Sequence, residues 1–414
     1  KGYNVFVSDQ SEIKPEFQKE LKDAGIEFES GKHTIERILK AKEIVKSPGI
    51  PEKAEIVKAA KAKGINVIGE IEFASRFTKG KIVAITGSNG KTTTTNLIYH
   101  LLKTSGLKVE MGGNVGFSFA RLVMHEPVEV PIYVLEMSSF QLDDCQKFRP
   151  DVAVLLNITP DHLDRYDYKF ERYIESKFRI AMNQKASNKF IFNGMDEHVT
   201  GFLKSHPIMA KKVKIGKGFF KNGQLLVNKL AFPMEKSALK GQHNMFNAAC
   251  AIRAAMFFGA GLDTLQIGLE TFLTPPHRLE FVRNLNGVDF INDSKATNVD
   301  SVFYALDAMT KKVVWIVGGT DKGNDYSPLF GLVKKKVRAI VCLGADNVKL
   351  LEVFGGFKKK MVEVKSANEA VKKANKLAKK GEVVLLSPAC ASFDLFKNYE
   401  DRGTQFKNAV MQLS

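Results

Sequence analysis

Residues 81–95 read Lys-Ile-Val-Ala-Ile-Thr-Gly-Ser-Asn-Gly-Lys-Thr-Thr-Thr-Thr. The apolar run Ile82–Ile85 predicts a short buried strand, and Asn96–Ser105 predicts a helix. Between them, Gly87 and Gly90 allow backbone N–H groups to converge on phosphate oxygens at the start of the helix. A strand, a glycine-rich loop and a helix in this order indicate a site for a nucleoside triphosphate.

The side chains around the loop indicate how a nucleotide would be held. Lys91 would reach the terminal phosphates, and the Thr92 hydroxyl would coordinate Mg²⁺. Ile85 stands at the first glycine position of the usual G-x-x-x-x-G-K-[ST] spacing, which weakens the case for a generic kinase or motor. A glycine turn with an incidental lysine is the alternative, and the strand–loop–helix order argues against it. The predicted nucleotide-binding residues here are Gly87, Ser88, Asn89, Gly90, Lys91, Thr92 and Thr93.

Composition favours a cytoplasmic enzyme with several domains. A chain of 414 residues is long enough for about two to four domains. No apolar run approaches the ~20 residues that span a bilayer, and no secretory signal is visible, although the chain opens abruptly, as if earlier residues were missing. The four cysteines are widely spaced and predict reduced thiols. We therefore expect no membrane insertion.

The net charge of +17 raises the question of nucleic-acid binding. The lysines are dispersed, with short clusters at 334–336 and 358–360, and no RNA- or DNA-binding motif accompanies them. We expect a solvated basic surface, no nucleic-acid partner, and some attraction of anionic small substrates.

Strands and helices alternate along most of the chain and predict an α/β protein with three domains. Residues 1–72 predict a Rossmann-like unit, incomplete at its start because no glycine-rich loop precedes its first strand. Asp9 follows that strand, where such folds place a ribose-contacting acid; a surface turn explains it nearly as well. Residues 73–276 predict a central P-loop ATPase domain with a mostly parallel sheet, and 277–414 predict a C-terminal Rossmann-like domain.

Acidic residues follow two further predicted strands of the central segment. Glu136 comes directly after the strand Ile132–Leu135, where a carboxylate suits a Mg²⁺ ligand or the cap of the next helix. Asn157–Asp164 follows the strand Val152–Leu156 and contains His162 beside two acids. His162 alone would be an ordinary surface or capping histidine. Acidic residues thus follow an apolar strand twice, and this repetition favours a site for a hard metal ion.

Several motifs together resemble the Mur ligases, which join amino acids to UDP-linked peptidoglycan precursors and are related to the folylpolyglutamate synthases. They are Thr86–Thr94, Glu136–Ser139, Asn157–Asp164, Gly241–Asn247 and His277-Arg278. Further stretches resemble the D-glutamate-adding branch, namely Ser47–Ile50, Asn292–Asn298, Leu386–Asp394, and Tyr399 with Arg402-Gly403. The resemblance covers essentially the whole chain, in the family's motif order.

This resemblance implies site residues. Lys91, His162 and Lys177 would be catalytic, and Thr92, Glu136, His162 and Lys177 would hold metal. A protonated Lys177 would be repelled by Mg²⁺, so it points away or becomes a carboxylate-like carbamate with CO₂. Asn244 and Asn247 would lie near adenine, and Arg278 and Asp293 would contact the nucleotide. The implied contacts to the UDP-muramoyl substrate are Asp9, Ser47, Asn114 and Ser138, and those around D-glutamate are Lys295, Thr297, Lys322, Ser392, Phe393 and Tyr399.

The implied reaction is ATP-dependent addition of D-glutamate to UDP-N-acetylmuramoyl-L-alanine through an acyl phosphate, with ATP and Mg²⁺ required. A monomer is expected. Tyr399 departs from the family pattern only in adding a hydroxyl to an aromatic wall. The alternatives are a sibling ligase with another amino acid, a folylpolyglutamate synthase-like ligase, and a non-catalytic nucleotide-binding module.

Overall fold

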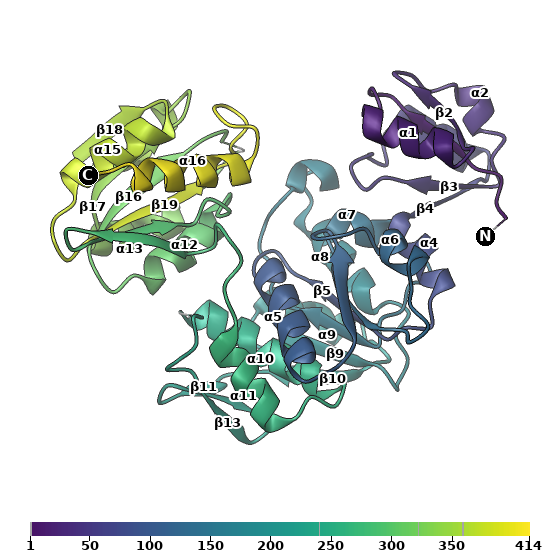
Figure 1. Cartoon of the computed structure of the whole chain (residues 1–414), viewed down its shortest axis with the longest axis horizontal. Helices are drawn as coiled ribbons and strands as arrows, with labels where there is room; N and C mark the ends of the chain where they lie inside the picture. Colours follow the sequence, from purple (N-terminus) through teal and green to yellow (C-terminus); the bar gives the residue numbers. More distant parts are fainter. Residues whose placement is uncertain (1, 240, 322, 358–359) are drawn as a thin grey trace.

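The computed structural model describes residues 2–239, 241–321, 323–357 and 360–414, so Lys322 lies outside the described residues. Three α/β units follow one another, with the first and the last on opposite sides of the central one (Figure 1). The expected three-unit α/β fold is confirmed, while the boundaries near residues 72 and 276 stay predictions. No helix in the described part of the chain is long and apolar enough to cross a membrane.

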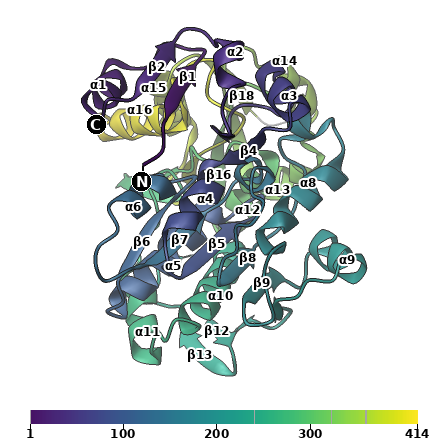
Figure 2. The same cartoon turned by 90° about the vertical axis from the view of Figure 1, so that its right-hand side faces the viewer.

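The N-terminal unit contains two separate pairs of parallel strands, at the top of the molecule in Figure 2. The sequence near the N-terminus predicts a first strand from Tyr3 or Asn4, whereas β1 begins at Phe6 and the Tyr3 ring packs edge-on against Phe73 and Phe77. The elements are β1 Phe6–Asp9, α1 Pro15–Asp23, β2 Glu27–Ser30, α2 Ile35–Ile38, β3 Glu43–Lys46, α3 Glu55–Ala62 and β4 Asn66–Gly69.

Buried polar contacts join this unit to the central one. Lys46 Nζ donates to Asp144 Oδ2 at 2.7 Å, and both side chains are almost wholly buried. Gln146 Nε2 donates to Asn66 Oδ1 at 2.8 Å and to the Val67 carbonyl at 3.3 Å. Satisfied polar groups of this kind fix one docking geometry, because any other arrangement would leave a charge buried without a partner.

A parallel sheet of six strands forms the central unit, in the order β10-β9-β8-β5-β7-β6. Val83 and Ile85 of β5 pack into one core and Ile82 and Ala84 into the other, which explains the uninterrupted apolar run. The strands are β5 Ile82–Thr86, β6 Val109–Gly113, β7 Ile132–Glu136, β8 Val152–Leu155, β9 Lys189–Asn193 and β10 Lys211–Ile215.

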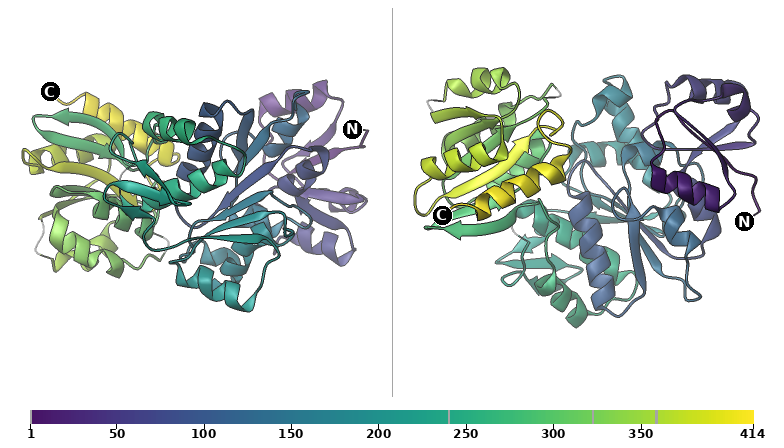
Figure 3. Two further views of the ribbon diagram at one scale, coloured as in Figure 1. Left: turned by 90° about the horizontal axis from the view of Figure 1, so that it is seen from below. Right: turned by 45° about the horizontal axis from the view of Figure 1, so that its top comes forward.

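Helices cover both faces of this sheet (Figure 3). α5 packs against α10 and α11 on one face. The helices are α4 Glu70–Ala74, η1 Ser75–Phe77, α5 Lys91–Thr104, α6 Phe119–Met124, α7 Ser139–Asp143, η2 Leu163–Tyr166, α8 Phe170–Phe178, η3 Arg179–Ala181, α9 Glu197–Ser205, α10 Gln242–Met256 and α11 Leu262–Thr271.

Two local predictions meet different outcomes in this unit. α5 begins at Lys91 rather than at Asn96, because the four threonines 92–95 are buried against the core, which overrides the weak helix propensity of β-branched residues. The dipeptide Asn222-Gly223 predicts a hairpin turn, and this is confirmed, with both residues at positive φ. Its strands are β11 Phe220–Lys221, β12 Gln224–Val227 and β13 Leu230–Pro233.

The C-terminal unit has a mixed sheet, β14-β15-β19-β16-β17-β18, in which β14 alone of the described strands pairs antiparallel. Its strands are β14 Glu280–Leu285, β15 Val288–Asn292, β16 Val313–Gly318, β17 Val337–Leu343, β18 Lys360–Val364 and β19 Val383–Ala389. Its helices are α12 Val299–Ala308, η4 Ser327–Leu329, α13 Phe330–Lys336, α14 Val348–Gly355, α15 Ala367–Leu377 and α16 Tyr399–Met411. β14 and β18 were not predicted.

Candidate functional site

The glycine-rich loop lies between β5 and α5, where the strand order places β8 on one side and β7 on the other. Carboxyl ends of parallel strands meet at one edge of a sheet, so residues after β7 and β8 converge on this loop. Gly90 has φ +85°, and a Cβ there would lie 2.6 Å from Asn247 Oδ1. Glycine is therefore required at position 90 both for the left-handed turn and for the approach of α10.

Lys91 turns back over the loop. Its Nζ donates to the carbonyl oxygens of Gly87 at 2.7 Å and Ser88 at 2.8 Å. Burial lowers the pKa of the Lys91 ammonium, and the carboxylates of Glu136 and Asp161 partly oppose that shift. The lysine and the two acids thus belong to one electrostatic site at the predicted phosphate loop.

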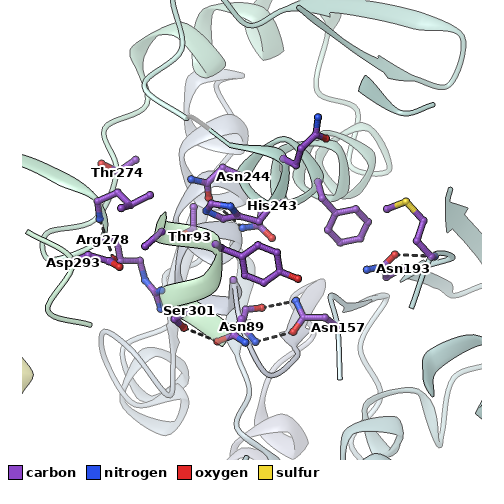
Figure 4. A pocket seen from close by; sticks show the side chains of 18 of the residues that line it. Asn89, Thr93, Asn157, Asn193, His243, Asn244, Thr274, Arg278, Asp293 and Ser301 are labelled. Atoms are coloured by element: carbon purple, nitrogen blue, oxygen red, sulfur yellow. Dashed lines mark hydrogen bonds between the residues drawn. The ribbon is translucent and has the colours of Figure 1, made fainter. Parts of the chain in front are cut away.

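The segment after β8 is hydrogen-bonded to the glycine-rich loop. Asn157 Oδ1 accepts from the Asn89 backbone N–H at 2.8 Å, and Asn157 Nδ2 donates to the Asn89 carbonyl at 3.0 Å (Figure 4). Ser88 Oγ donates to the Thr159 carbonyl at 2.8 Å and lies 3.2 Å from the Tyr173 hydroxyl. Asn157 carried no assigned role in the sequence analysis, although it begins a quoted motif.

Glu136 ends β7 with a buried carboxylate. Its Oε1 accepts from Asn114 Nδ2 at 2.8 Å, while its Oε2 is buried without a hydrogen-bond partner. A buried oxygen without a donor is costly unless a cation or water satisfies it. Thr92, in the first turn of α5 after the loop, offers a hydroxyl oxygen, which accepts from Arg278 Nη2 at 3.3 Å. A carboxylate and a hydroxyl suit Mg²⁺, so these residues fit the ion.

His162 lies in a different setting from Glu136. Its backbone is left-handed at φ +52°, its ring packs edge-on against Phe140, and its Nε2 is 3.7 Å from Asp161 Oδ2. The residues that the structure describes contain no group of three His, Cys, Asp or Glu side chains able to hold a metal. Two of the expected metal ligands, Thr92 and Lys177, are not His, Cys, Asp or Glu. The predicted ligand set of Thr92, Glu136, His162 and Lys177 therefore stays a prediction.

Lys177 is buried beneath the loop, on α8. Its Nζ donates to the Gly87 carbonyl at 2.9 Å and lies 4.9 Å from the centre of the Tyr173 ring. Burial, reinforced by the positive charge of Lys91, lowers the pKa of the Lys177 amine well below its ordinary value. The structure thus brings Lys177 and Lys91 to the same carbonyl oxygen and favours a neutral amine at position 177.

A cavity of about 320 Å³ opens beside the loop, between the central and C-terminal units (Figure 4). This size is in the range of small-molecule pockets. Seven of the predicted nucleotide-binding residues line it, namely Asn89, Gly90, Thr93, Asn244, Asn247, Arg278 and Asp293. Burial lowers the pKa of His243, which also lines the cavity, to about 4, so this ring is neutral at pH 7.

The C-terminal unit contributes directly to this cavity. Asp293 Oδ2 accepts from Ser387 Oγ at 2.8 Å, and burial raises the pKa of the Asp293 carboxyl to about 7. Ser301 Oγ donates to Asn89 Oδ1 at 2.9 Å (Figure 4), and Asn298 Nδ2 donates to the same oxygen at 3.3 Å. The start of α12 is therefore in contact with the glycine-rich loop.

The expected D-glutamate residues are only partly brought together. Lys295 Nζ lies 5.0 Å from the centre of the Tyr399 ring, and burial together with Arg278 lowers the pKa of Lys295 to about 8. Thr297 bonds locally through its N–H to the Lys295 carbonyl. Ser392 is buried, whereas Phe393 is 72% exposed, and Lys322 is outside the described residues.

The expected contacts to the UDP-muramoyl substrate are spread over two units. Asp9 is exposed, and its Oδ1 accepts a hydrogen bond from the Ser11 N–H at 2.8 Å. This arrangement matches the alternative in which Asp9 is a surface-turn residue. Ser47 is exposed in the turn after β3, and Ser138 forms a capping box with Gln141 at the start of α7. Asn114 is the one of these four bonded to the loop edge, through Glu136. None of these roles is tested by the geometry.

Sequence reasoning missed residues that act across domains. Phe219 and Tyr304 line the cavity beside the glycine-rich loop, from the β10–β11 loop and α12. Arg165 donates to the carbonyls of Gly49 at 2.9 Å and Pro48 at 3.2 Å, and so ties η2 to the turn after β3. The quoted motif Asn157–Asp164 ends one residue before Arg165, and no local pattern marked Phe219 or Tyr304.

Fold and site together define a P-loop nucleotide-binding α/β protein whose loop is completed by a C-terminal unit. Three family models match the chain: "Mur ligase MurD-like, N-terminal domain" over residues 1–69, "Mur ligase middle domain" over 85–255, and "Mur ligase, glutamate ligase domain" over 277–390. A relative from Cytophaga hutchinsonii, named UDP-N-acetylmuramoylalanine--D-glutamate ligase, is 52% identical over 100% of this chain and 95% of its own length. The chain belongs to the Mur ligase family.

Other relatives and solved structures agree. The proteins of the same name from Christiangramia forsetii and Porphyromonas gingivalis are 49% and 48% identical, over 100% of this chain and 95% and 94% of their own lengths. The MurF ligase from Thermotoga maritima in complex with ADP is 20% identical, covers 91% of this chain and 99% of its own, and gives a TM-score of 0.63. The UDP-N-acetylmuramate-alanine ligase from the same organism is 17% identical with a TM-score of 0.62, over 98% and 93%. These structures establish the shared fold.

Proposed function

We infer that this chain uses ATP to join D-glutamate to UDP-N-acetylmuramoyl-L-alanine in peptidoglycan precursor synthesis. The observation that carries the inference is the convergence of the glycine-rich loop, buried Glu136, buried Lys177 and the C-terminal Arg278 at one edge, in a family whose curated relatives bear that enzyme name. The chain spans nearly the full length of those relatives.

The chemistry begins with activation of a carboxylate, because amide formation in water is uphill. The γ-phosphoryl group of ATP passes to the L-alanine carboxylate, an O–P bond forms, and ADP leaves. The amine of D-glutamate attacks the acyl phosphate, and the tetrahedral intermediate expels phosphate. Lys91 neutralises charge on the transferred phosphoryl oxygens, as its position over Gly87 and Ser88 supports.

Metal ions would be held by Thr92 and Glu136 at the phosphates and by His162 with carbamylated Lys177 nearby. When bound, Mg²⁺ supplies charge neutralisation at phosphate and acyl oxygens. Lys295 and Thr297 would bind the carboxylates of D-glutamate, with Tyr399 as a wall. The proton of the attacking ammonium goes to His162 or a neighbouring acid, and Asp161 is that neighbour at 3.7 Å.

Carbamylation of Lys177 is supported by its setting. Its neutral amine nitrogen forms an N–C bond with CO₂ and releases one proton, which turns a buried neutral group into an anion next to Lys91. Labelled ¹³C bicarbonate should give a carbamate NMR signal in the wild-type protein and none in Lys177→Ala. A signal of equal strength in both proteins would contradict the assignment.

The experiment that tests the function is phosphate release from ATP with UDP-N-acetylmuramoyl-L-alanine and one amino acid at a time. We expect release with D-glutamate and none with L-alanine, L-lysine or diaminopimelate. Release with another amino acid would identify a sibling ligase, and release that depends on a folate would favour the folylpolyglutamate synthase alternative. ATP binding without any substrate-dependent release would indicate a non-catalytic module.

All proposed residues come from one chain, so we expect a monomer acting in the cytoplasm. The buried cysteines Cys145, Cys250, Cys342 and Cys390 are free thiols, which fits a reducing compartment.

A further inference from the structure

Arg165 of η2 extends from the central unit to a turn of the N-terminal unit. Its Nη1 donates to the Gly49 carbonyl at 2.9 Å, and its Nη2 donates to the Pro48 carbonyl at 3.2 Å. Both carbonyls belong to the turn 47–50, which follows β3. A planar guanidinium holds two acceptors in a fixed geometry, which the single ammonium of a lysine does not. The contact therefore sets the orientation of the turn as well as its distance from the central unit.

The same turn is held a second time, by a side chain of its own unit. Lys46 Nζ donates to the Ile50 carbonyl at 2.9 Å and to Asp144 Oδ2 of the central unit at 2.7 Å. The carbonyls of residues 48, 49 and 50 thus all accept from cationic side chains that bridge the two units. Bonds to three successive carbonyls restrict backbone rotation in the turn. The turn is therefore ordered against the central unit without any ligand.

Aromatic rings of the central unit hold Arg165 from its own side. The guanidinium carbon lies 4.4 Å from the centre of the Phe140 ring, where a cation is attracted by the ring face. The Phe140 ring stacks on Tyr166 with ring centres 6.4 Å apart, and it packs edge-on against His162 at 5.2 Å. Arg165 thus connects the turn 47–50 to the ring beside His162, a predicted site residue.

An ordinary surface role does not account for the partners of Arg165. Residues 161, 164 and 167 are aspartates, so a solvated arginine in this stretch is expected to pair with one of them, as Arg172 pairs with Asp167. Arg165 is instead half-buried and bonds to uncharged backbone carbonyls of another unit. Its contacts place a segment of backbone rather than neutralise a charge.

We propose that Arg165 is a positioning residue for the UDP-linked substrate: it holds the turn 47–50, which carries the predicted substrate contact Ser47, in place before the substrate binds. This role rests on the proposed function. A turn that is already ordered loses little conformational entropy on binding, so the contact raises affinity for that substrate.

The role of Arg165 is confined to one of the three substrates. The residues that line the cavity beside the glycine-rich loop run from Asn89 to Ala305 and come from the central and C-terminal units. The turn 47–50 belongs to the N-terminal unit, which lies on the opposite side of the central unit from the C-terminal one (Figure 1). Loss of Arg165 should therefore weaken binding of the UDP-linked substrate and leave ATP binding unchanged.

The test uses the full chain with Arg165→Met, which keeps an unbranched aliphatic stem and removes the guanidinium. In calorimetric titrations, affinity for UDP-N-acetylmuramoyl-L-alanine should fall about 10-fold or more, because two charge-assisted hydrogen bonds that order the turn are lost. Affinity for a non-hydrolysable ATP analogue should change less than about twofold. Turnover at saturating substrate should also stay within about twofold of the wild type, since the bound substrate then holds the turn itself.

Two further measurements separate this role from a general effect on the fold. Arg172→Met removes the same group from the exposed pair with Asp167, and affinity for the UDP-linked substrate should change less than about twofold. In the ligand-free proteins, amide hydrogen exchange at Gly49 and Ile50 should be faster in Arg165→Met than in the wild type, and unchanged in Arg172→Met.

The possible contradictions are distinct from one another. Equal affinity of Arg165→Met and the wild type for the UDP-linked substrate, an equal loss in Arg172→Met, or an equal loss of ATP-analogue binding would each overturn the positioning role. Unchanged amide exchange at the turn would overturn it as well. A wild-type chain that binds the ATP analogue but not UDP-N-acetylmuramoyl-L-alanine would contradict the proposed function, and the positioning role with it.

Discussion

The loop edge of the central sheet and the N-terminal unit hold their predicted ligand residues in different ways. Glu136 and Lys177 are buried and bonded to groups far away in the sequence. Asp9 and Ser47 are exposed and bonded to near neighbours. The difference teaches that the predicted phosphoryl-transfer groups are fixed by a closed core, whereas the predicted ligand residues of the N-terminal unit depend on how that whole unit is docked.

The largest effect is expected at the buried ion pair between the N-terminal and central units. Replacing Lys46 by Met leaves the Asp144 carboxylate buried without its 2.7 Å partner, which should cost about 3–5 kcal/mol of unfolding free energy. Urea denaturation measures it. The control is Lys61→Met, whose pair with Glu52 is half exposed and should cost less than about 0.5 kcal/mol. Equal costs would show that the two units dock by other means.

Removing the lysine over the loop should act on rate rather than on folding. Lys91→Ala should lower substrate-dependent phosphate release by ~10²-fold or more, because the phosphoryl charge loses its neutralising ammonium. The unfolding midpoint, followed by circular dichroism, should stay near that of the wild type. Near-normal turnover in this variant would remove the central role given to the loop edge.

Asp293 is a buried carboxyl group of the C-terminal unit that lines the cavity beside the loop. Its raised pKa predicts that the free energy of unfolding depends on pH. Burial raises the pKa of its carboxyl to about 7, above the value of ~3.9 for the unfolded chain. The folded state therefore binds the extra proton between about pH 4 and pH 7, and ionisation across that window should remove up to about 1.4 kcal/mol of stability per pH unit. Asp293→Asn should abolish this part of the slope in urea titrations at several pH values. An unchanged slope would mean that another group titrates there.

The smallest effect is expected for Asp9, an exposed residue of the N-terminal unit. Asp9→Ala removes only the 2.8 Å bond to the Ser11 N–H, and stability should change by less than about 0.5 kcal/mol. The Michaelis constant for UDP-N-acetylmuramoyl-L-alanine decides its role. A rise of fivefold or more would support the ribose-contacting role, and no change would leave Asp9 as a turn residue.

Much of the fold followed from local patterns. The strands β5, β7 and β8 were predicted within one residue at each end because all are uninterrupted apolar runs bounded by polar residues. The edge strands β14 and β18 were missed, since polar residues interrupt their short apolar runs and most of their side chains are partly exposed. The helix predicted at α5 began too late, at Asn96, because the threonines 92–95 are poor helix formers unless a core buries them.

The candidate site was predictable to the extent that its residues sit in motifs. The loop, Glu136 and the residues of α10 were named before the structure brought them to one edge. Phe219, Tyr304 and Arg165 were not, because each acts through a neighbour more than 100 residues away or from another unit.

By itself the sequence determined the nucleotide loop, the alternation of strands and helices, and the resemblance to Mur ligases. These depend on short-range spacing, which is written along the chain. Only the tertiary structure decided that Lys177 lies beneath Gly87 and that Ser301 reaches Asn89. Burial and electrostatic coupling depend on which distant segments pack together, and no local pattern contains that information.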